Sequence, residues 1–444
     1  MNGILAGQVV RAGRPGQPAW TPVFIAFLAY AFVILTYRVP IGTAVMAAAL
    51  MGLILQRHAV RVPTFLWLYA AWLGWSGVGL VTSDYSEAVQ LTLIEQIKVL
   101  LVALVAANAL RTGTQIRHFM IFMLVSYVLF PVRSTLVNYF ITGNTLFGRA
   151  IGPFIYSNPN DLAALTILML GPTLALWASA PRGSLVRWAG VAGAAPLILV
   201  IVLTQSRGGF LALATIAFPS AVTLARRRPR AAIGFAALLA LGLYLAPAGF
   251  WKRMQGLEKG TSVATISQMD PEGSAGQRFA VLQTALRIVR DHPILGVGLG
   301  AYGLANARYN PALGDLDTHN TYLNVLAENG VPGLILFFAL VISVLRTVHD
   351  TRRRVRRALP AQAEMLRWLE IGLIGFLIAA VFGSQSKLAL FYVYLALLWC
   401  TSRAVRAQIP PASPAAVPLP FPLDRTMTAV DRRPGPGDPR SRPA

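Results

Sequence analysis

The sequence is poor in charged residues. Asp, Glu, Lys and Arg make up 13% of its 444 residues, whereas 55% are hydrophobic, and the mean hydropathy is +0.58. An ordinary soluble domain has a lower apolar share, so the composition excludes a water-soluble globular protein. The single cysteine, Cys400, excludes an intrachain disulfide and a thiolate metal site. No histidines and carboxylates have metal-ligand spacing, which argues against a metal-dependent mechanism, and no cofactor is expected.

Acidic residues are especially scarce. The 17 Asp and Glu are outnumbered by 39 Lys and Arg, which gives a net charge of +22. Basic chains often bind phosphate polymers, but these positive residues lie in short loops between apolar runs, where they set topology and attract anionic lipid. Membrane lipids are therefore expected partners, and nucleic acid is not. Residues 1–19 are too polar for a cleavable signal peptide, so Met1 is expected to begin the mature protein.

Long apolar runs are what the sequence has in abundance. Runs of roughly 17 to 23 residues recur, the length that crosses about 30 Å of hydrocarbon as a helix. The pattern predicts an all-α polytopic membrane protein with about twelve transmembrane helices. We expect them near residues 20–37, 39–55, 63–81, 88–110, 118–140, 160–179, 188–204, 209–225, 231–248, 331–347, 368–383 and 388–402.

The distribution of arginine orients these spans. With a cytoplasmic N-terminus, the inside segments gather the arginines and the short outside loops are nearly bare, as the positive-inside rule requires. The reverse orientation would place the Arg-rich clusters outside. Both termini are therefore expected in the cytoplasm. The inside residues are Arg11, Arg14, Arg57, Arg61, Arg111, Arg117, Arg182, Arg187, the cluster from Arg226 to Arg230 and the run from Arg346 to Arg367.

The spans divide the chain into four parts, one of which is a large extracytoplasmic loop. The last part is rich in proline, arginine and small residues and has no apolar period, which is typical of a disordered tail. The parts are residues 1–248 with transmembrane helices 1–9, the loop domain at 249–330, residues 331–403 with helices 10–12, and a cytoplasmic tail at 404–444.

The large loop is expected to contain short helices. Residues 276–290 have apolar residues at helical spacing. Phe279, Leu282, Leu286 and Val289 fall on one stripe, and Arg278 lies off it.

The end of this loop carries the first candidate site. Residues 317–336 read DTHNTYLNVLAENGVPGLIL, and His319 stands just before the chain turns back into the membrane. A neutral imidazole there can act as a general base near neutral pH; alternatively, His319 only hydrogen-bonds or caps the loop. Asn320 and Glu328 are secondary candidates, because such residues are more often caps. Glu328 falls near the azimuth of Asn324 in a helix and could line a cleft.

The second candidate site is the turn TQSRGG at residues 204–209, between two spans. The planar fork of Arg207 suits a phosphate or pyrophosphate, and the glycines beside it allow a head group to approach the backbone; snorkelling to the interface is the alternative. Ser206 is a secondary candidate. Arg278 and Arg149 face the same side on this topology, and three arginines with one histidine form a stronger pattern than any one of them.

Three other polar features have a structural interpretation first. The sequence NPND at residues 158–161 is typical of a cap before a transmembrane helix. Glu95 and Lys98, three residues apart in an apolar span, are expected to pair and to face the protein interior, with a functional relay as the alternative. His292 precedes the glycine-rich GVGLGAYG, which we interpret as a flexible turn, so this histidine is expected to be structural.

Three segments in order resemble a known family. They read GPFIYSNPNDLA, TQSRGGFLALA and, after HPILGVGLGAYG, THNTYLNVLAENGVPGLIL. Over roughly residues 145–345 they resemble the bacterial O-antigen ligase and polymerase superfamily of membrane glycan transferases. The last segment is the most specific, and the first span and the tail carry no family signal.

The resemblance implies a glycosyltransferase of the bacterial inner membrane with a periplasmic active site. The donor is then a glycan on undecaprenyl diphosphate, with no nucleotide sugar and no metal, and the acceptor in ligases is the lipid A-core oligosaccharide. His319 matches the family's catalytic histidine, and Arg207 and Arg278 match its essential arginines. Arg149 is added from its position alone.

These roles imply a mechanism and leave alternatives. Arginines stabilise the leaving diphosphate, and His319 deprotonates the acceptor hydroxyl as it attacks the anomeric carbon, so inversion is expected without the carboxylate pair of a glycosidase. An O-antigen ligase is the expected function. An O-antigen or exopolysaccharide polymerase and a protein O-oligosaccharyltransferase remain open. A lipid-linked glycan transporter is a more distant alternative, because the chain lacks visible halves and a midplane site.

Overall fold

The computed structural model describes residues 19–55, 60–227, 233, 251 and 274–409. These residues are almost entirely helical, as predicted, and the elements lie within one compact unit, Met1–Gln408. The α-helices are α1 Pro22–Thr36, α2 Gly42–Leu55, α3 Thr64–Gly77, α4 Gly79–Thr82, α5 Ser86–Ala109, α6 Gly113–Tyr127, α7 Arg133–Val137, α8 Pro159–Ser179, α9 Leu185–Leu203, α10 Arg207–Arg227, α13 Ser274–Asp291, α14 Tyr302–Tyr309, α15 Thr321–Val355, α16 Pro360–Ala379 and α17 Ala389–Arg406. The other elements are the π-helices Val128–Val132 and Asn138–Thr142, the 3-10 helices Phe154–Tyr156 and η7 Ala380–Phe382, and the strands β1 Thr145–Leu146 and β2 Arg149–Ala150.

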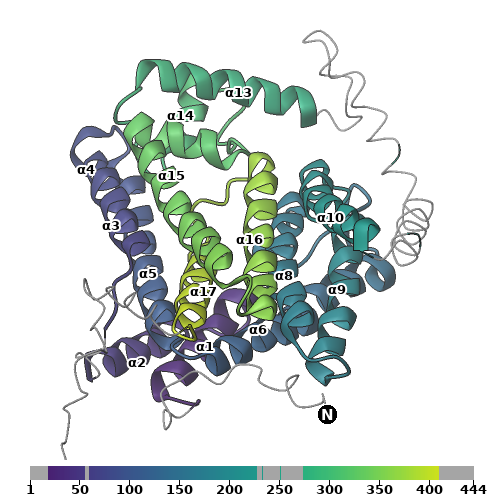
Figure 1. Ribbon diagram of the computed structural model, residues 1–444. Coiled ribbons are helices and arrows are strands. Elements are labelled where there is room, and N and C mark those ends of the chain that lie inside the picture. The colour runs from purple at the N-terminus through teal and green to yellow at the C-terminus, as the bar shows by residue number, and fades with distance from the viewer. Residues whose placement is uncertain (1–18, 56–59, 228–232, 234–250, 252–273, 410–444) are drawn as a thin grey trace, which may run out of the picture. The chain divides into compact units, whose positions relative to one another are not determined.

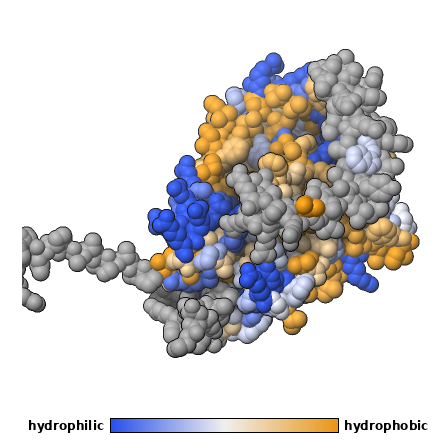
Figure 2. All heavy atoms as spheres, turned by 45° about the vertical axis from the view of Figure 1, so that its right-hand side comes forward, coloured by the Kyte–Doolittle hydropathy of each residue, from blue (hydrophilic) through white to orange (hydrophobic). Residues whose placement is uncertain are grey.

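The helices have the length and the surface of a multi-pass membrane protein. In the described ranges, seven helical segments are long and apolar enough to cross a membrane, and α1, α2 and the first part of α10 are shorter apolar helices. Figure 2 shows broad hydrophobic areas on the face that it displays, and Leu55, Val81 and Leu185 are among the exposed side chains. Each predicted span except 231–248 coincides with a helix. That span lies outside the described residues, so the total of twelve stays a prediction.

Helix α8 is the central helix of the bundle. In its most apolar window 78% of the residues are buried, and α8 lies beside α16 in Figure 1. Gly171 of α8 and Gly372 of α16 face each other, and a Cβ on Gly372 would lie 2.7 Å from the Cα of Gly171. Small residues allow helix backbones to approach closely in a membrane. The glycine pair therefore sets the spacing of the two helices.

We expect Gly372→Ala to destabilise the protein. The added methyl group meets backbone atoms that cannot turn aside, and overpacking of this kind costs about 1–3 kcal/mol. The measurement is the thermal unfolding midpoint of the detergent-purified protein. The control is Gly74→Ala in α3, where nothing lies within 4 Å of an added Cβ. Equal midpoints for the two variants would contradict the close approach of α8 and α16.

One end of the bundle gathers basic residues. Burial lowers the pKa of Arg61, and the positive charges of Arg403 and Arg111 lower it further. At the same end, the guanidinium of Arg406 donates to the hydroxyl of Thr351 at 2.6 Å. Arg61 and Arg111, which were assigned to the same side from the sequence, therefore do share one end of the molecule.

The opposite end carries the helices of the loop. Helices α13 and α14 lie across the end of α15 in Figure 1. Helix α15 is interrupted at Gly330, where φ is +66° and ψ is −172°. Residues 321–329 thus form a short helix apart from the span, and the predicted start of that span at residue 331 coincides with the interruption.

The glycine-rich segment GVGLGAYG, residues 296–303, is closely packed at its glycines. The segment packs between α5 and α15. A Cβ on Gly298 (φ +105°) would lie 2.6 Å from the side chain of Val89 in α5. The backbone N–H of Val297 donates to the carbonyl of Ala327 at 2.9 Å, which satisfies a group freed by the break in α15. Glycines at these positions allow both the positive φ and the close packing.

Helix α13 confirms the predicted helix in the loop. Val281, Ala285 and Ile288 are buried and pack with residues of α14 and α15, whereas Leu282 and Leu286 are 39% and 54% exposed. The buried face of α13 is therefore not the apolar stripe that contains Leu282 and Leu286. The helix has apolar residues around much of its circumference, and the contacts with α14 and α15 select the face that is buried.

Candidate active site

His319 occupies a strained position between α14 and α15. Its φ is +50°, which is uncommon for a residue with a side chain. Thr318 and Asn320 hold it from both sides: the Thr318 hydroxyl donates to the Asn320 carbonyl at 2.9 Å and accepts from the Asn320 N–H at 3.2 Å. Strained conformations persist only where the surroundings fix them, and they cluster at active sites.

Asn320 is the N-cap of α15. Its side-chain oxygen accepts from the backbone N–H groups of Tyr322 and Leu323 at 3.0 and 3.1 Å. This is the cap role that the sequence left open for it. The cap fixes where α15 begins, directly after His319.

Two charged residues act on His319. Burial lowers the pKa of the imidazole below 6.5, the positive charge of Arg278 in α13 lowers it further, and the negative charge of Asp317 opposes both. The imidazole is therefore mainly neutral at pH 7, which is the form that accepts a proton. His319 and Arg278, two of the predicted site residues, lie within electrostatic reach of each other.

Arg149 supports the turn before α10. It is 6% exposed, and its guanidinium donates to the carbonyl of Thr204 and to the side-chain oxygen of Asn160, both at 2.9 Å. The hydroxyl of Ser206 donates to the same Asn160 oxygen at 2.9 Å. The NPND segment is therefore more than a cap, although Asn158 does cap α8. These contacts give Arg149 a positioning role, and its binding of a diphosphate stays a prediction.

Arg207 begins α10, after a left-handed residue. Gln205 has φ +49°, and its side chain donates to the carbonyl of Gly148 at 3.1 Å. A Cβ on Gly208 would lie 2.5 Å from the ring of Phe382 in η7. The close approach of α10 and η7 therefore requires a glycine beside Arg207 and places this arginine next to the loop that follows η7.

That loop, residues 383–387 with the sequence GSQSK, contacts the segment that carries His319. The hydroxyls of Ser384 and Thr318 share a hydrogen bond of 3.2 Å, next to His319. The side chain of Gln385 donates to Asp161 of α8 at 3.1 Å. Phe382, just before this loop, lies against Gly208 of α10, and the loop itself contacts Thr318 beside His319, so Arg207 and His319 lie at the same end of the bundle.

Sequence reasoning missed residues 383–387 and Asp161. The loop belongs to none of the motifs, and Asp161 was assigned to a helix cap. The available signal was a polar run with a lysine between two apolar spans, on a side whose short loops are otherwise nearly bare of positive charge.

Glu328 does not line an open cleft. It is 2% exposed, and its carboxylate accepts from Asn324 at 3.4 Å and from Lys387 at 2.8 Å. Its predicted proximity to Asn324 is confirmed. The partner Lys387 lies in the loop that the sequence analysis did not use.

Glu95 and Lys98 form the predicted pair, at 2.6 Å, but the pair does not face the interior. Their side chains are 66% and 57% exposed. The buried residue of this turn is Gln96, which accepts from the hydroxyl of Tyr69 at 2.8 Å. Helix α5 packs against its neighbours through the face that carries Gln96, so Glu95 and Lys98 point away from the bundle.

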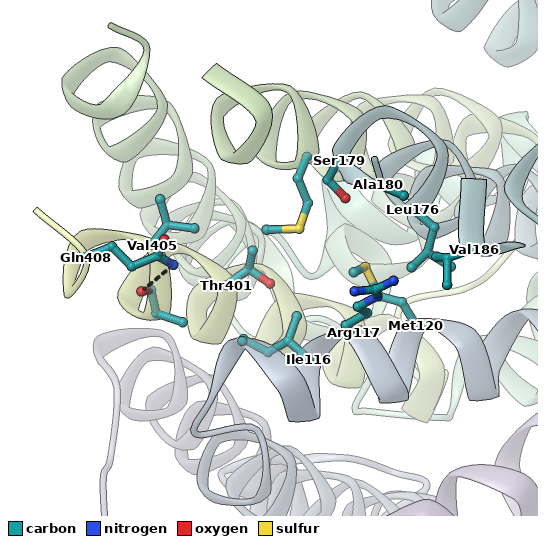
Figure 3. A pocket seen from close by; sticks show the side chains of 13 residues that line it. Ile116, Arg117, Met120, Leu176, Ser179, Ala180, Val186, Thr401, Val405 and Gln408 are labelled. Carbon is teal, nitrogen blue, oxygen red and sulfur yellow. Dashed lines mark hydrogen bonds between the residues drawn. The ribbon is translucent and has the colours of Figure 1, made fainter. Parts of the chain in front are cut away.

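A cleft lies at the basic end, away from His319. Figure 3 shows Arg117, Met120, Leu176 and Gln408 among its lining residues, which come from the ends of several helices. The side chains that could perform transfer chemistry are not among them. In the described ranges, no three His, Cys, Asp or Glu residues are grouped so as to hold a metal ion.

Comparison with known families agrees with the sequence motifs. Residues 192–338 match the model of a family described as O-Antigen ligase, and this segment contains Arg207, Arg278 and His319. No curated protein matches the sequence at a significant level. The match confirms the resemblance to the O-antigen ligase superfamily over residues 192–338.

Proposed function

We propose that the chain is an O-antigen ligase that transfers a glycan from undecaprenyl diphosphate to the lipid A-core oligosaccharide. The observation that carries the proposal is the position of Arg207, Arg278 and His319 at one end of the bundle, within the segment that matches the family. The basic end is the cytoplasmic one by the positive-inside rule. The site then faces the periplasm of a bacterial inner membrane, and both termini are cytoplasmic.

The reaction follows from the charges at this end. Neutral His319 takes the proton of the acceptor hydroxyl, and the oxygen attacks the anomeric carbon from the side opposite the diphosphate. The bond from that carbon to the diphosphate oxygen breaks, and the electron pair leaves with the diphosphate. Arg207 and Arg278 stabilise the developing negative charge. The configuration of the anomeric carbon is inverted in the product, and the mechanism requires no metal ion.

Two bacterial hosts distinguish a ligase from a polymerase. One lacks its own O-antigen ligase and the other lacks its O-antigen polymerase, and each expresses this chain at a verified level in the membrane. A ligase restores lipopolysaccharide with attached O-chain in the first host and leaves the second unchanged. Restored chain length in the second host alone would favour the polymerase. New glycans on periplasmic proteins, found by mass spectrometry, would favour a protein acceptor.

The pH dependence of transfer should reflect the lowered pKa of His319. The base is active when neutral, so activity is lost as the pH falls through its pKa in the folded protein. Burial and Arg278 lower this pKa from 6.5. We therefore expect kcat/KM, measured between about pH 5 and 8, to fall on the acid side with a midpoint below 6.5. An acid limb centred above that value would contradict the environment described for His319.

A further inference from the structure

A buried ion pair lies behind the His319 segment. The ammonium group of Lys387 is 2.8 Å from the carboxylate of Glu328, whose side chain is 2% exposed, whereas that of Lys387 is 30% exposed. A buried carboxylate without a cation is strongly destabilising. Lys387 is anchored as well, since its carbonyl accepts from the side chain of Gln96 in α5 at 3.1 Å. The pair therefore ties residues 321–329 to α5 through the loop 383–387.

Asn324 connects this ion pair to a second carboxylate, that of Asp317. Its amide nitrogen donates to Glu328 at 3.4 Å and to Asp317 at 3.1 Å. Only the nitrogen of the amide can donate to two carboxylates, so the side chain has one orientation that satisfies both. The carboxylate of Asp317 also accepts from the N–H of Thr318 at 2.7 Å.

Asp317 acts electrostatically on the candidate base and raises its pKa. Its carboxylate is held two residues before His319, and its charge acts on the imidazole. Other charged groups at this position include Arg278 of α13, which acts on His319, and Asp161 of α8, which interacts electrostatically with Asp317. Loss of the Asn324 contact would free Asp317 to turn into solvent, since it is exposed.

We propose that Lys387 is a positioning residue for His319. It acts through a continuous chain of contacts formed by Glu328, Asn324 and Asp317. These contacts fix the position of the Asp317 carboxylate and the backbone conformation of His319. Lys387 itself touches no reacting atom in this scheme. The proposal rests on the proposed function for the reaction that His319 performs, whereas the contacts themselves do not.

The titration of His319 tests these contacts without any substrate. Diethyl pyrocarbonate modifies neutral imidazole. The folded membrane protein is treated with it at a series of pH values, and mass spectrometry of the resulting peptides gives the rate of modification at His319. Asn324→Leu and Asp317→Asn should each move the midpoint to lower pH, because each removes the negative charge or its fixed position. Asn310→Leu, at the end of α14, is the control and should leave the midpoint unchanged.

The Lys387 variants test the contact that lies furthest from His319, the ion pair of Lys387 with Glu328. We expect Lys387→Gln to lower kcat about tenfold with little change in KM, since a hydrogen bond to a charged group is lost at a distance from the substrate. The His319 midpoint should move in the same direction as in Asn324→Leu, and Lys387→Arg should restore both values. The double variant Lys387→Gln/Asn324→Leu should be no worse than Asn324→Leu alone.

Additive effects in the double variant, or an unmoved His319 midpoint in Asn324→Leu, would overturn the proposal. If Lys387→Gln does not fold, Asn324→Leu still decides, because it leaves the ion pair intact. If the protein transfers no glycan but the titration shifts as expected, the positioning chain stands and the proposed function is wrong.

Discussion

Replacement of His319 by asparagine is expected to reduce glycan transfer by about a hundredfold to ten-thousandfold, the contribution of a positioned general base. Asparagine adopts positive φ more readily than alanine, so this variant keeps the backbone at φ +50° and removes the base. The measurement is the initial rate of transfer by purified protein. In cells, carrier-linked polymer should accumulate while lipopolysaccharide lacks O-chain.

The matched control is His292→Asn. His292 follows α13 and is exposed, so its loss removes an imidazole from the same end of the molecule without touching the site. Membrane protein level and thermal stability should be equal in both variants. Unchanged transfer in His319→Asn would leave His319 as a loop residue, and the mechanism would lose its base.

Replacement of Arg207 by alanine is expected to lower kcat by about a hundredfold to a thousandfold, the effect of removing one donor from a developing negative charge. Lysine keeps the charge but not the planar fork, so Arg207→Lys should recover only part of the rate. Steady-state kinetics with varied donor should show the loss in kcat. A rise in KM alone would mean that Arg207 binds the donor without stabilising its departure.

Arg308 provides the control for charge at this end of the molecule. It lies in α14 and pairs with Asp84 at 2.7 Å, with side chains 66% and 72% exposed. Exposed pairs contribute little to stability. Arg308→Ala should therefore leave transfer and stability nearly unchanged. A loss as large as that of Arg207→Ala would indicate a general effect of net charge rather than a specific site.

The spans could be predicted because their cause is local. A run of apolar residues must be helical in lipid, where every backbone group has to be satisfied within the segment. The boundaries at 39–55 and 160–179 therefore lie close to those of α2 and α8. The gathering of Arg61 and Arg111 at one end follows in the same way from the alternation of spans and loops.

The site could be predicted in part. His319 and Arg207 were found because a histidine and an arginine on the sparsely charged side of a membrane protein are unusual for their position. Lys387 and Asp161 were missed because their importance comes from partners far away in the sequence. Lys387 meets Glu328, and Asp161 meets Gln385 across 224 residues. No spacing in the sequence encodes such contacts.

The sequence by itself determined an all-α membrane protein, the side on which its polar residues gather and the motifs that resemble the O-antigen ligase superfamily. Only the tertiary structure decided which face of α13 is buried, that Glu95 and Lys98 point outward, and that residues 382–387 contact both α10 and the segment of His319. The physical reason is the range of the forces. Hydrophobic length and helix formation act between neighbours in the sequence, whereas the choice of a buried face and the pairing of buried polar groups depend on which helices pack together.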